Sequence, residues 1–128
     1  MYGTITVNNK EMGFKASALT PVLFHQVFKY DLLVNLTKFE GKDENNISTE
    51  ESIEYLNLAT KLGFIMNMQA EKTSFKQLGK ITIENYYGWL DMFANTIDIP
   101  IPDIMNIYYG GEIVDVQAKK EDAEPSEN

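Results

Sequence analysis

Side chains suited to acid–base or nucleophilic chemistry are scarce in this chain, which has one histidine, His25, and no cysteine among 128 residues. Histidine and cysteine dominate such chemistry because their protonation changes near neutral pH or because they bind metals. His25 lies beside Phe24 and near Phe28, and no spacing indicates an orienting carboxylate or a nucleophile. We interpret it as a helix-surface or partly packed histidine and predict no catalytic residue.

Acidic residues offer two other places for chemistry. Glu84 and Asp91 lie seven residues apart and would share a helix face, so a small enzyme using carboxylates alone is one alternative, although no partner group accompanies them. The run Asp43 to Asn46 resembles part of a calcium loop but lacks the alternating ligands, central glycine and terminal glutamate of an EF-hand. No glycine pattern for phosphate binding occurs. We therefore expect a protein that is not an enzyme, with no metal and no cofactor.

The charge of the chain argues against nucleic acid as its main partner. Its net charge is −8, and all eleven basic residues are lysines, so it lacks the arginine forks that bind phosphate and guanine. Residues 112–128 hold six acidic residues and two lysines. An acidic inhibitor that mimics DNA remains an alternative, but it requires acids spread along one face of the body. With no apolar run near the ~20 residues of a membrane span and no secretion signal, we expect a cytoplasmic protein without membrane contact.

The first part of the chain predicts a β-hairpin over residues 2–15. Residues 2–7 alternate in the period of two that is typical of strands, Asn8 and Asn9 supply turn chemistry, and an extended pattern resumes at Met12. Two strands alone are marginally stable in water, so the hairpin must pack on helices or pair with another chain.

The remainder, residues 20–110, predicts a helical body. Thr20 and Pro21 indicate a helix start with Thr20 as N-cap, and Asp31 is expected to restart or bend that helix. Ser48 and Glu51 form a capping box that opens a long helix to about residue 70, central in the fold or buried between subunits. Residues 71–80 read as a polar link, Thr82 caps a further helix, and a short helix follows Pro102.

These elements predict one mostly helical α+β domain over residues 1–111, with a hairpin and about four to five helices. Residues 112–128, acidic and containing Pro125, are expected to form a disordered C-terminal segment.

Aromatic and methionine side chains are too numerous in the last helices to face one way. Part of this set is core, and the remainder is exposed apolar surface, which on a soluble protein marks a partner-binding site. The predicted partner-binding residues are Tyr87, Trp89, Met92 and Tyr109.

Self-association is predicted through the long helix and the hairpin edge, because both offer more apolar or unpaired surface than one small domain needs. The long helix carries a second apolar stripe: Ile53, Leu56, Thr60, Gly63 and Phe64. Gly63 and Gly88 either permit close helix–helix approach, including across a subunit boundary, or are tolerated irregularities. The residues predicted for self-association in a homo-oligomer are Ile5, Val7, Gly63 and Phe64.

The order of these segments resembles a known family. Residues 5–16, ITVNNKEMGFKA, are similar to the VNGKEYxFKA-like opening of tail assembly chaperones from long-tailed phages and prophages of Gram-positive bacteria. The likeness continues through the apolar region from Leu19 to Leu36, the helix with Trp89-Leu90-Asp91 and the short helix at Pro102-Asp103-Ile104. Asn9 stands where the family often has glycine, which affects only the turn.

The resemblance implies a non-enzymatic role. Such chaperones coat the tape measure protein, keep it soluble, help tail-tube subunits to assemble around it in the host cytoplasm, and are absent from the mature virion. They are made in a short form, which this chain resembles, and in a longer form that arises by ribosomal frameshift. Ala118-Lys119-Lys120 is a candidate slip site because tandem lysine codons are A-rich, although the two lysines could equally just moderate the charge of the acidic segment.

Overall fold

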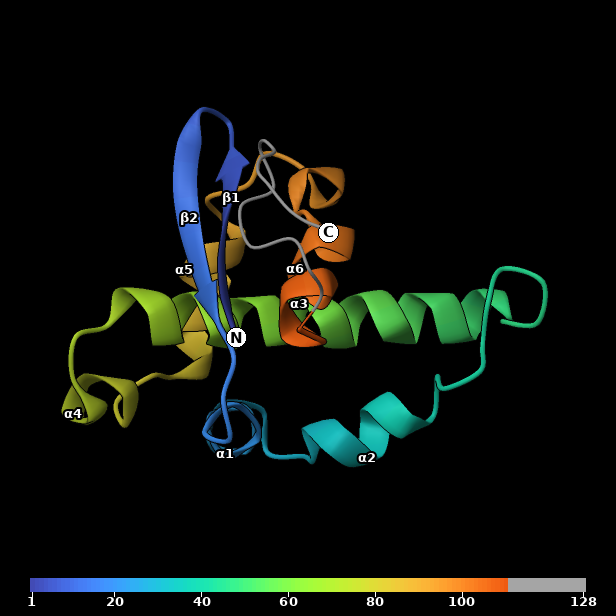
Figure 1. Ribbon diagram of the computed structural model, residues 1–128, viewed down its shortest axis with the longest axis horizontal. Helices are drawn as coiled ribbons and strands as arrows, with labels where there is room; N and C mark the ends of the chain where they lie inside the picture. Colours follow the sequence, from blue (N-terminus) through green and yellow to red (C-terminus); the bar gives the residue numbers. More distant parts are fainter. Residues whose placement is uncertain (111–128) are drawn as a thin grey trace.

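A long central helix organises the fold. The computed structural model describes residues 1–110, and within them a two-stranded hairpin precedes six α-helices and one short 3-10 helix (Figure 1). Helix α3 (Thr49–Glu71) contacts β2, α1, α2, α5 and α6, so it is the common partner of most other elements. The hairpin and α6 lie on one side of α3 in this view, and α1 and α2 on the other. The predicted fold class, a hairpin followed by a mostly helical body, is confirmed.

The hairpin is formed by β1 (Tyr2–Val7) and β2 (Lys10–Lys15), as predicted. Val7 pairs with Lys10 across a two-residue turn in which Asn8 and Asn9 have φ angles of 52° and 65°. Asparagine tolerates this left-handed conformation, which matches the twist of the two strands. One face of the hairpin is buried against the helices through Ile5, Met12 and Phe14. The hairpin is therefore stabilised by packing within the chain.

Helix α1 (Thr20–Phe28) starts differently from the prediction. Pro21 occupies the first turn, but Leu19 is the N-cap residue and makes no side-chain cap. The Thr20 hydroxyl is fully buried and donates instead to Gln69 Oε1 of α3 at 2.6 Å. The Thr20 hydroxyl oxygen also accepts from the Ser17 N–H at 2.9 Å, before the helix, and Thr20 itself is the first helical residue, so the prediction of Thr20 as N-cap was wrong.

A break separates α1 from α2 (Leu32–Thr37). Lys29 adopts a left-handed φ of 66°, and the Asp31 carboxylate then accepts from the Val34 N–H at 2.7 Å as the N-cap of α2. The expected restart at Asp31 is confirmed. The chain thereby turns so that α2 also packs on α3.

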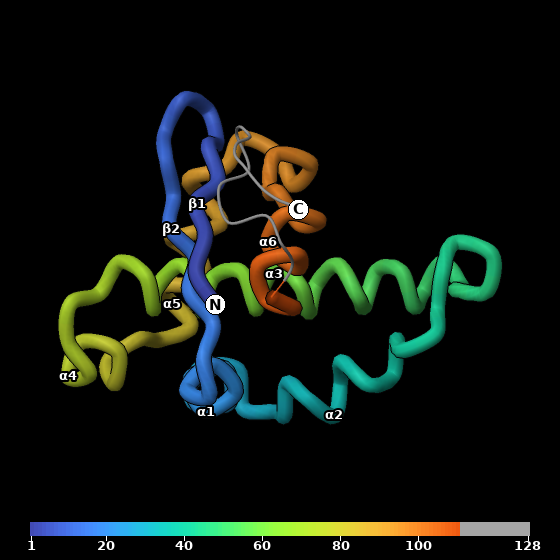
Figure 2. The backbone as a smooth tube through the Cα atoms, in the orientation of Figure 1, coloured from blue at the N-terminus to red at the C-terminus, as the bar shows by residue number. Residues whose placement is uncertain are grey.

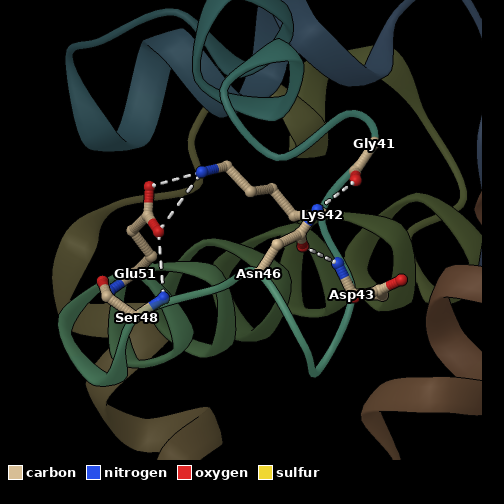
Figure 3. Close-up of polar contacts among 6 residues, drawn as sticks. All are labelled: Gly41, Lys42, Asp43, Asn46, Ser48 and Glu51. Atoms are coloured by element: carbon tan, nitrogen blue, oxygen red, sulfur yellow. Dashed lines mark hydrogen bonds and ion pairs between the residues drawn. The ribbon is translucent and has the colours of Figure 1, made fainter.

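The α2–α3 connection ends in the predicted capping box. Ser48 Oγ accepts from the Glu51 N–H at 3.1 Å, and Glu51 Oε1 accepts from the Ser48 N–H at 3.0 Å. Figure 3 shows Lys42 reaching the same carboxylate, with Nζ 3.2 Å from Glu51 Oε2. The Ser48 N–H first and Lys42 second hold the pKa of Glu51 below its usual value. In the preceding loop, Asn46 Oδ1 accepts from the Asp43 N–H at 2.6 Å, so polar groups of the loop are used to fix the turn itself.

The second half of the chain returns over α3. A four-residue helix, α4 (Phe75–Leu78), lies within the predicted polar link, and α5 (Ile83–Leu90) begins at Thr82 in a second capping box, with Asn85. A 3-10 helix (Thr96–Asp98) precedes α6 (Ile101–Tyr108). Gly110, with a φ of 73°, follows the end of α6. The predicted disorder of residues 112–128 lies outside the described residues.

Candidate partner-binding surface

Trp89 belongs to the core, in contrast to the prediction that it binds a partner. Its side chain is 4% exposed, and its indole N–H donates to Asn67 Oδ1 at 2.9 Å. Asn67 Nδ2 in turn donates to the Gly13 carbonyl at 2.7 Å. These two bonds connect α5, α3 and β2 through one buried amide. The sequence reasoning missed Asn67, because a polar residue on a helix normally indicates its solvent face.

The other three predicted partner-binding residues are exposed, and two of them, Met92 and Tyr109, line different cavities. Tyr109 is 66% exposed and lines a shallow cavity with Tyr55, between α2 and the end of α6. Met92 is 54% exposed and borders a cavity between β2, α3 and α5 of about 300 Å³. Tyr87 is 60% exposed and is adjacent to Tyr86, with ring centroids 6.2 Å apart. The structure therefore does not bring these residues together into one site.

The residues predicted for self-association are mostly enclosed by their own chain. Ile5 and Phe64 are 3% and 0% exposed, and Val7 is half-buried against the core. A Cβ on Gly63 would lie 2.8 Å from Ile104 Cδ1, so this glycine does permit close helix–helix approach, but between α3 and α6 of one chain. Ile5, Gly63 and Phe64 offer almost no surface to a second copy, and that part of the prediction is corrected.

An apolar groove lies between α1 and α4, and the sequence predicted only a polar link for the region that contains α4. We call this groove the α1–α4 groove, and it encloses about 600 Å³. Val22 and Phe75, which line it, are 60% and 82% exposed, whereas Leu23 and Leu78 are buried beneath. The apolar residues that line it are Leu19, Val22, Leu23, Phe75 and Leu78.

Polar groups in the α1–α4 groove are already paired with one another. Gln26 Nε2 donates to the carbonyls of Leu78 and Ile81 at 3.1 and 3.3 Å, which fixes the end of α4 against α1. Gln69 accepts from Thr20 and donates to Ser17 Oγ at 3.2 Å. Because these amides have partners, the groove makes little demand for polar ligand atoms and suits apolar side chains.

Tyr86 and Tyr109 both stay protonated near neutral pH. Burial, with smaller contributions from Tyr30 and Tyr87, raises the pKa of Tyr86 to about 12. Burial and then Glu40 raise the pKa of Tyr109, so both phenols stay protonated and contribute apolar rings and O–H donors. His25, Glu84 and Asp91 are exposed. Within residues 1–110, no three His, Asp or Glu side chains are grouped as a metal site.

Comparisons with known proteins give no relative from which a function could be transferred to this chain. The chain matches no family model, no curated protein and no solved structure. In the part of the chain that the structure describes, no helix combines the length and apolar character needed to cross a bilayer.

Proposed function

We propose that this chain is a tail assembly chaperone of a long-tailed phage or prophage, and that it holds the tape measure protein through the α1–α4 groove. The observation that carries the proposal is an apolar groove lined by two highly exposed side chains, Val22 and Phe75. Exposed apolar surface of this kind marks binding sites on soluble proteins. The resemblance of residues 5–16 to the family opening supplies the class of partner.

The groove suits a helical client. A tape measure protein is expected to be long, helical and striped with apolar residues, and such helices bind by placing residues at i, i+3 and i+4 into an apolar groove. Phe75 stands on the short helix α4, whose Ser74 Oγ accepts from the Gln77 N–H at 3.2 Å. Gln26 holds the end of that helix. These hydrogen bonds therefore hold the backbone that carries Phe75 in place at the edge of the groove.

Co-expression with the tape measure protein tests the proposal. The unaltered chain should keep the client in the soluble fraction, and the double variant Val22→Ser, Phe75→Ser should lose this effect because both groove walls become polar. Ile97→Ser is the matched control, since Ile97 is 85% exposed and does not line the groove. Circular dichroism of each variant establishes that it is folded.

Two results would contradict the proposal at different levels. If the unaltered chain leaves the client insoluble, the chaperone function is wrong. If the folded double variant still keeps the client soluble, the function stands and the client site lies elsewhere. In that case Tyr87→Ser, Met92→Ser and Tyr109→Ser, tested singly, show whether the client binds at one of the exposed residues predicted from the sequence.

The resemblance also supports three companion proposals. The chain acts in the host cytoplasm, it forms a homo-oligomer that light scattering at micromolar concentration would detect, and a frameshifted longer form recruits the tail-tube protein. Ala118-Lys119-Lys120 lies outside the described residues, and the nucleotides of codons 118–120 test that slip site. A sequence there without a slippery run rules it out.

A further inference from the structure

The cavity that Met92 borders lies where β2 and α5 meet the C-terminal half of α3, the yellow-green stretch of the tube in Figure 2. We call it the methionine cavity because Met12, Met68 and Met92 line it, half of the six methionines in the chain. Its volume of about 300 Å³ is at the lower end for ligand pockets and suits a partner's side chain better than a whole cofactor. Methionine is flexible and polarisable, so this lining adapts to aliphatic side chains of different shapes.

Gly88 leaves an open position at this cavity. It lies inside α5, where glycine is a poor helix former, and a Cβ placed on it would meet no atom within 4 Å. Gly63, inside α3, has a packing reason, because Ile104 of α6 lies 2.8 Å from the position of its missing Cβ. Packing within residues 1–110 therefore accounts for Gly63 but not for Gly88. A branched aliphatic side chain of a partner, packed on Gly88, would reproduce the contact that Ile104 makes.

The two asparagines that line the methionine cavity already have partners. Asn67 bonds to the Trp89 indole and to the Gly13 carbonyl. Asn85 Oδ1 accepts from the Thr82 N–H at 2.9 Å in the capping box of α5. Because these amides are used within the chain, the floor of the cavity makes little demand for polar ligand atoms and suits an apolar side chain.

The charged side chains at the methionine cavity have a positive balance. Lys10 and Lys72 line it together with Glu71, and all three are exposed. Within residues 1–110 the only ion pair joins Lys42 to Glu51, so neither lysine at the cavity is paired with a carboxylate there. On a chain with a net charge of −8, this balance favours an occupant that carries carboxylates beside its apolar residues.

We infer that the methionine cavity binds an amphipathic helix of a partner protein. A branched aliphatic side chain of that helix packs on Gly88 between the methionines, and carboxylates beside it face Lys10 and Lys72. A helix fits because Gly88 lies on a helix next to the end of α3, and the Gly63 contact shows that this chain packs helices closely at a glycine. The inference does not depend on the proposed function, which places the client in the α1–α4 groove.

NMR spectra of the full chain, labelled with ¹³C at the methionine methyl groups, test the inference. The probe is a stapled helical peptide of about four turns, with isoleucine and leucine along one face and glutamates beside them. We expect saturable shifts of the Met12, Met68 and Met92 signals, whereas the signals of Met66 and Met105, which are buried outside the cavity, shift much less. A matched peptide with lysines in place of the glutamates should bind several-fold more weakly.

The variant Gly88→Ala separates binding from folding. The added methyl group occupies the open position and should weaken binding of the glutamate peptide roughly tenfold. The free variant should nevertheless be more stable, because alanine is the better helix former. A purely structural role of Gly88 would not weaken binding in a more stable protein. Equal affinities of Gly88→Ala and the unaltered chain would overturn the inference.

The lysines are tested by a pair of double variants with the same change of charge. Lys10→Glu, Lys72→Glu should weaken binding several-fold. Lys76→Glu, Lys80→Glu is the matched control, since these lysines are exposed and do not line the cavity. Circular dichroism establishes that each variant is folded. Equal losses of affinity in the two double variants would contradict the inference.

Other occupants of the methionine cavity give different results. If the glutamate peptide shifts none of the three methionine signals, the cavity binds no such helix. If those signals shift with protein concentration alone, the cavity is covered by a second copy of this chain, and the inference is wrong. The variant Val22→Ser, Phe75→Ser should bind the peptide with unchanged affinity, because both residues lie at the α1–α4 groove. A loss in that variant would place the peptide in the α1–α4 groove instead.

Discussion

The two halves of α3 carry similar apolar residues and yet meet different surroundings. In the C-terminal half, six consecutive residues from Leu62 to Asn67 are buried, so the helix is enclosed on all sides. In the N-terminal half, Ile53 and Leu56 are 55% and 50% exposed. These two residues begin the same stripe that continues through Gly63 and Phe64. One apolar face is therefore covered at one end of the helix and open at the other.

The two ends of α3 differ because α5 and α6, which come later in the chain, cover its C-terminal half. Helix α6 places Ile104 against Gly63, and α5 places Trp89 against Phe64, with ring centroids 5.8 Å apart. At the other end, the segment that follows α2 places Phe39 against Tyr55, with ring centroids 5.4 Å apart, while Ile53 and Leu56 stay exposed. An apolar stripe thus indicates that a face can be buried, whereas the partner that buries it depends on the fold.

The largest effect should come from truncating the enclosed half. Phe64→Ala removes a fully buried ring that contacts Phe28, Tyr86 and Trp89, and should lower the free energy of unfolding by about 3–5 kcal/mol. Ile53→Ala in the open half should change it by no more than about 0.5 kcal/mol. Urea denaturation followed by circular dichroism measures both. Similar losses in the two variants would show that something covers Ile53 in solution.

An intermediate effect is expected from the buried amide. Asn67→Ala leaves the Trp89 indole N–H and the Gly13 carbonyl without this partner and should lower the free energy of unfolding by about 1–3 kcal/mol. The control is Asn57→Ala on the exposed part of the same helix, which should be near neutral. Amide hydrogen exchange should also quicken in β2 of the Asn67→Ala variant only. Unchanged exchange in β2 would mean that this amide does not secure the hairpin.

The smallest change in stability is expected when the two helical glycines, Gly63 and Gly88, are replaced by alanine. Nothing lies within 4 Å of a Cβ placed on Gly88, so Gly88→Ala should stabilise the protein by about 1 kcal/mol through helix propensity. At Gly63 the added methyl meets Ile104 at 2.8 Å, and the same gain should be offset by displacement of that side chain. Thermal unfolding compares the two variants. Equal stabilisation would show that the α3–α6 contact yields easily.

Local signals in the sequence predicted local structure well. The Asn8-Asn9 turn and the capping residues Ser48 and Thr82 depend on groups only a few residues apart, so their chemistry is visible in the chain itself. The roles of Thr20 and Trp89 were mistaken because each is set by a partner far along the chain: Gln69 for Thr20, and Asn67 for Trp89.

The candidate site could be predicted only in part. Exposed apolar residues were expected, and Tyr87, Met92 and Tyr109 are exposed. The α1–α4 groove was not foreseen, because its walls come from residues more than fifty positions apart, Val22 and Phe75. Phe75 lies in a run of polar residues, where no period marks it as part of an apolar surface.

The buried bond between Trp89 and Asn67 also gives the protein an optical reporter. Trp89 is the only tryptophan in the chain, so its fluorescence comes from a single known place, the junction of the hairpin, α3 and α5. An indole in an apolar, hydrogen-bonded site emits at shorter wavelength than one in water. Emission from the unmodified protein therefore follows whether this junction is closed, at concentrations too low for most structural methods and without any attached dye.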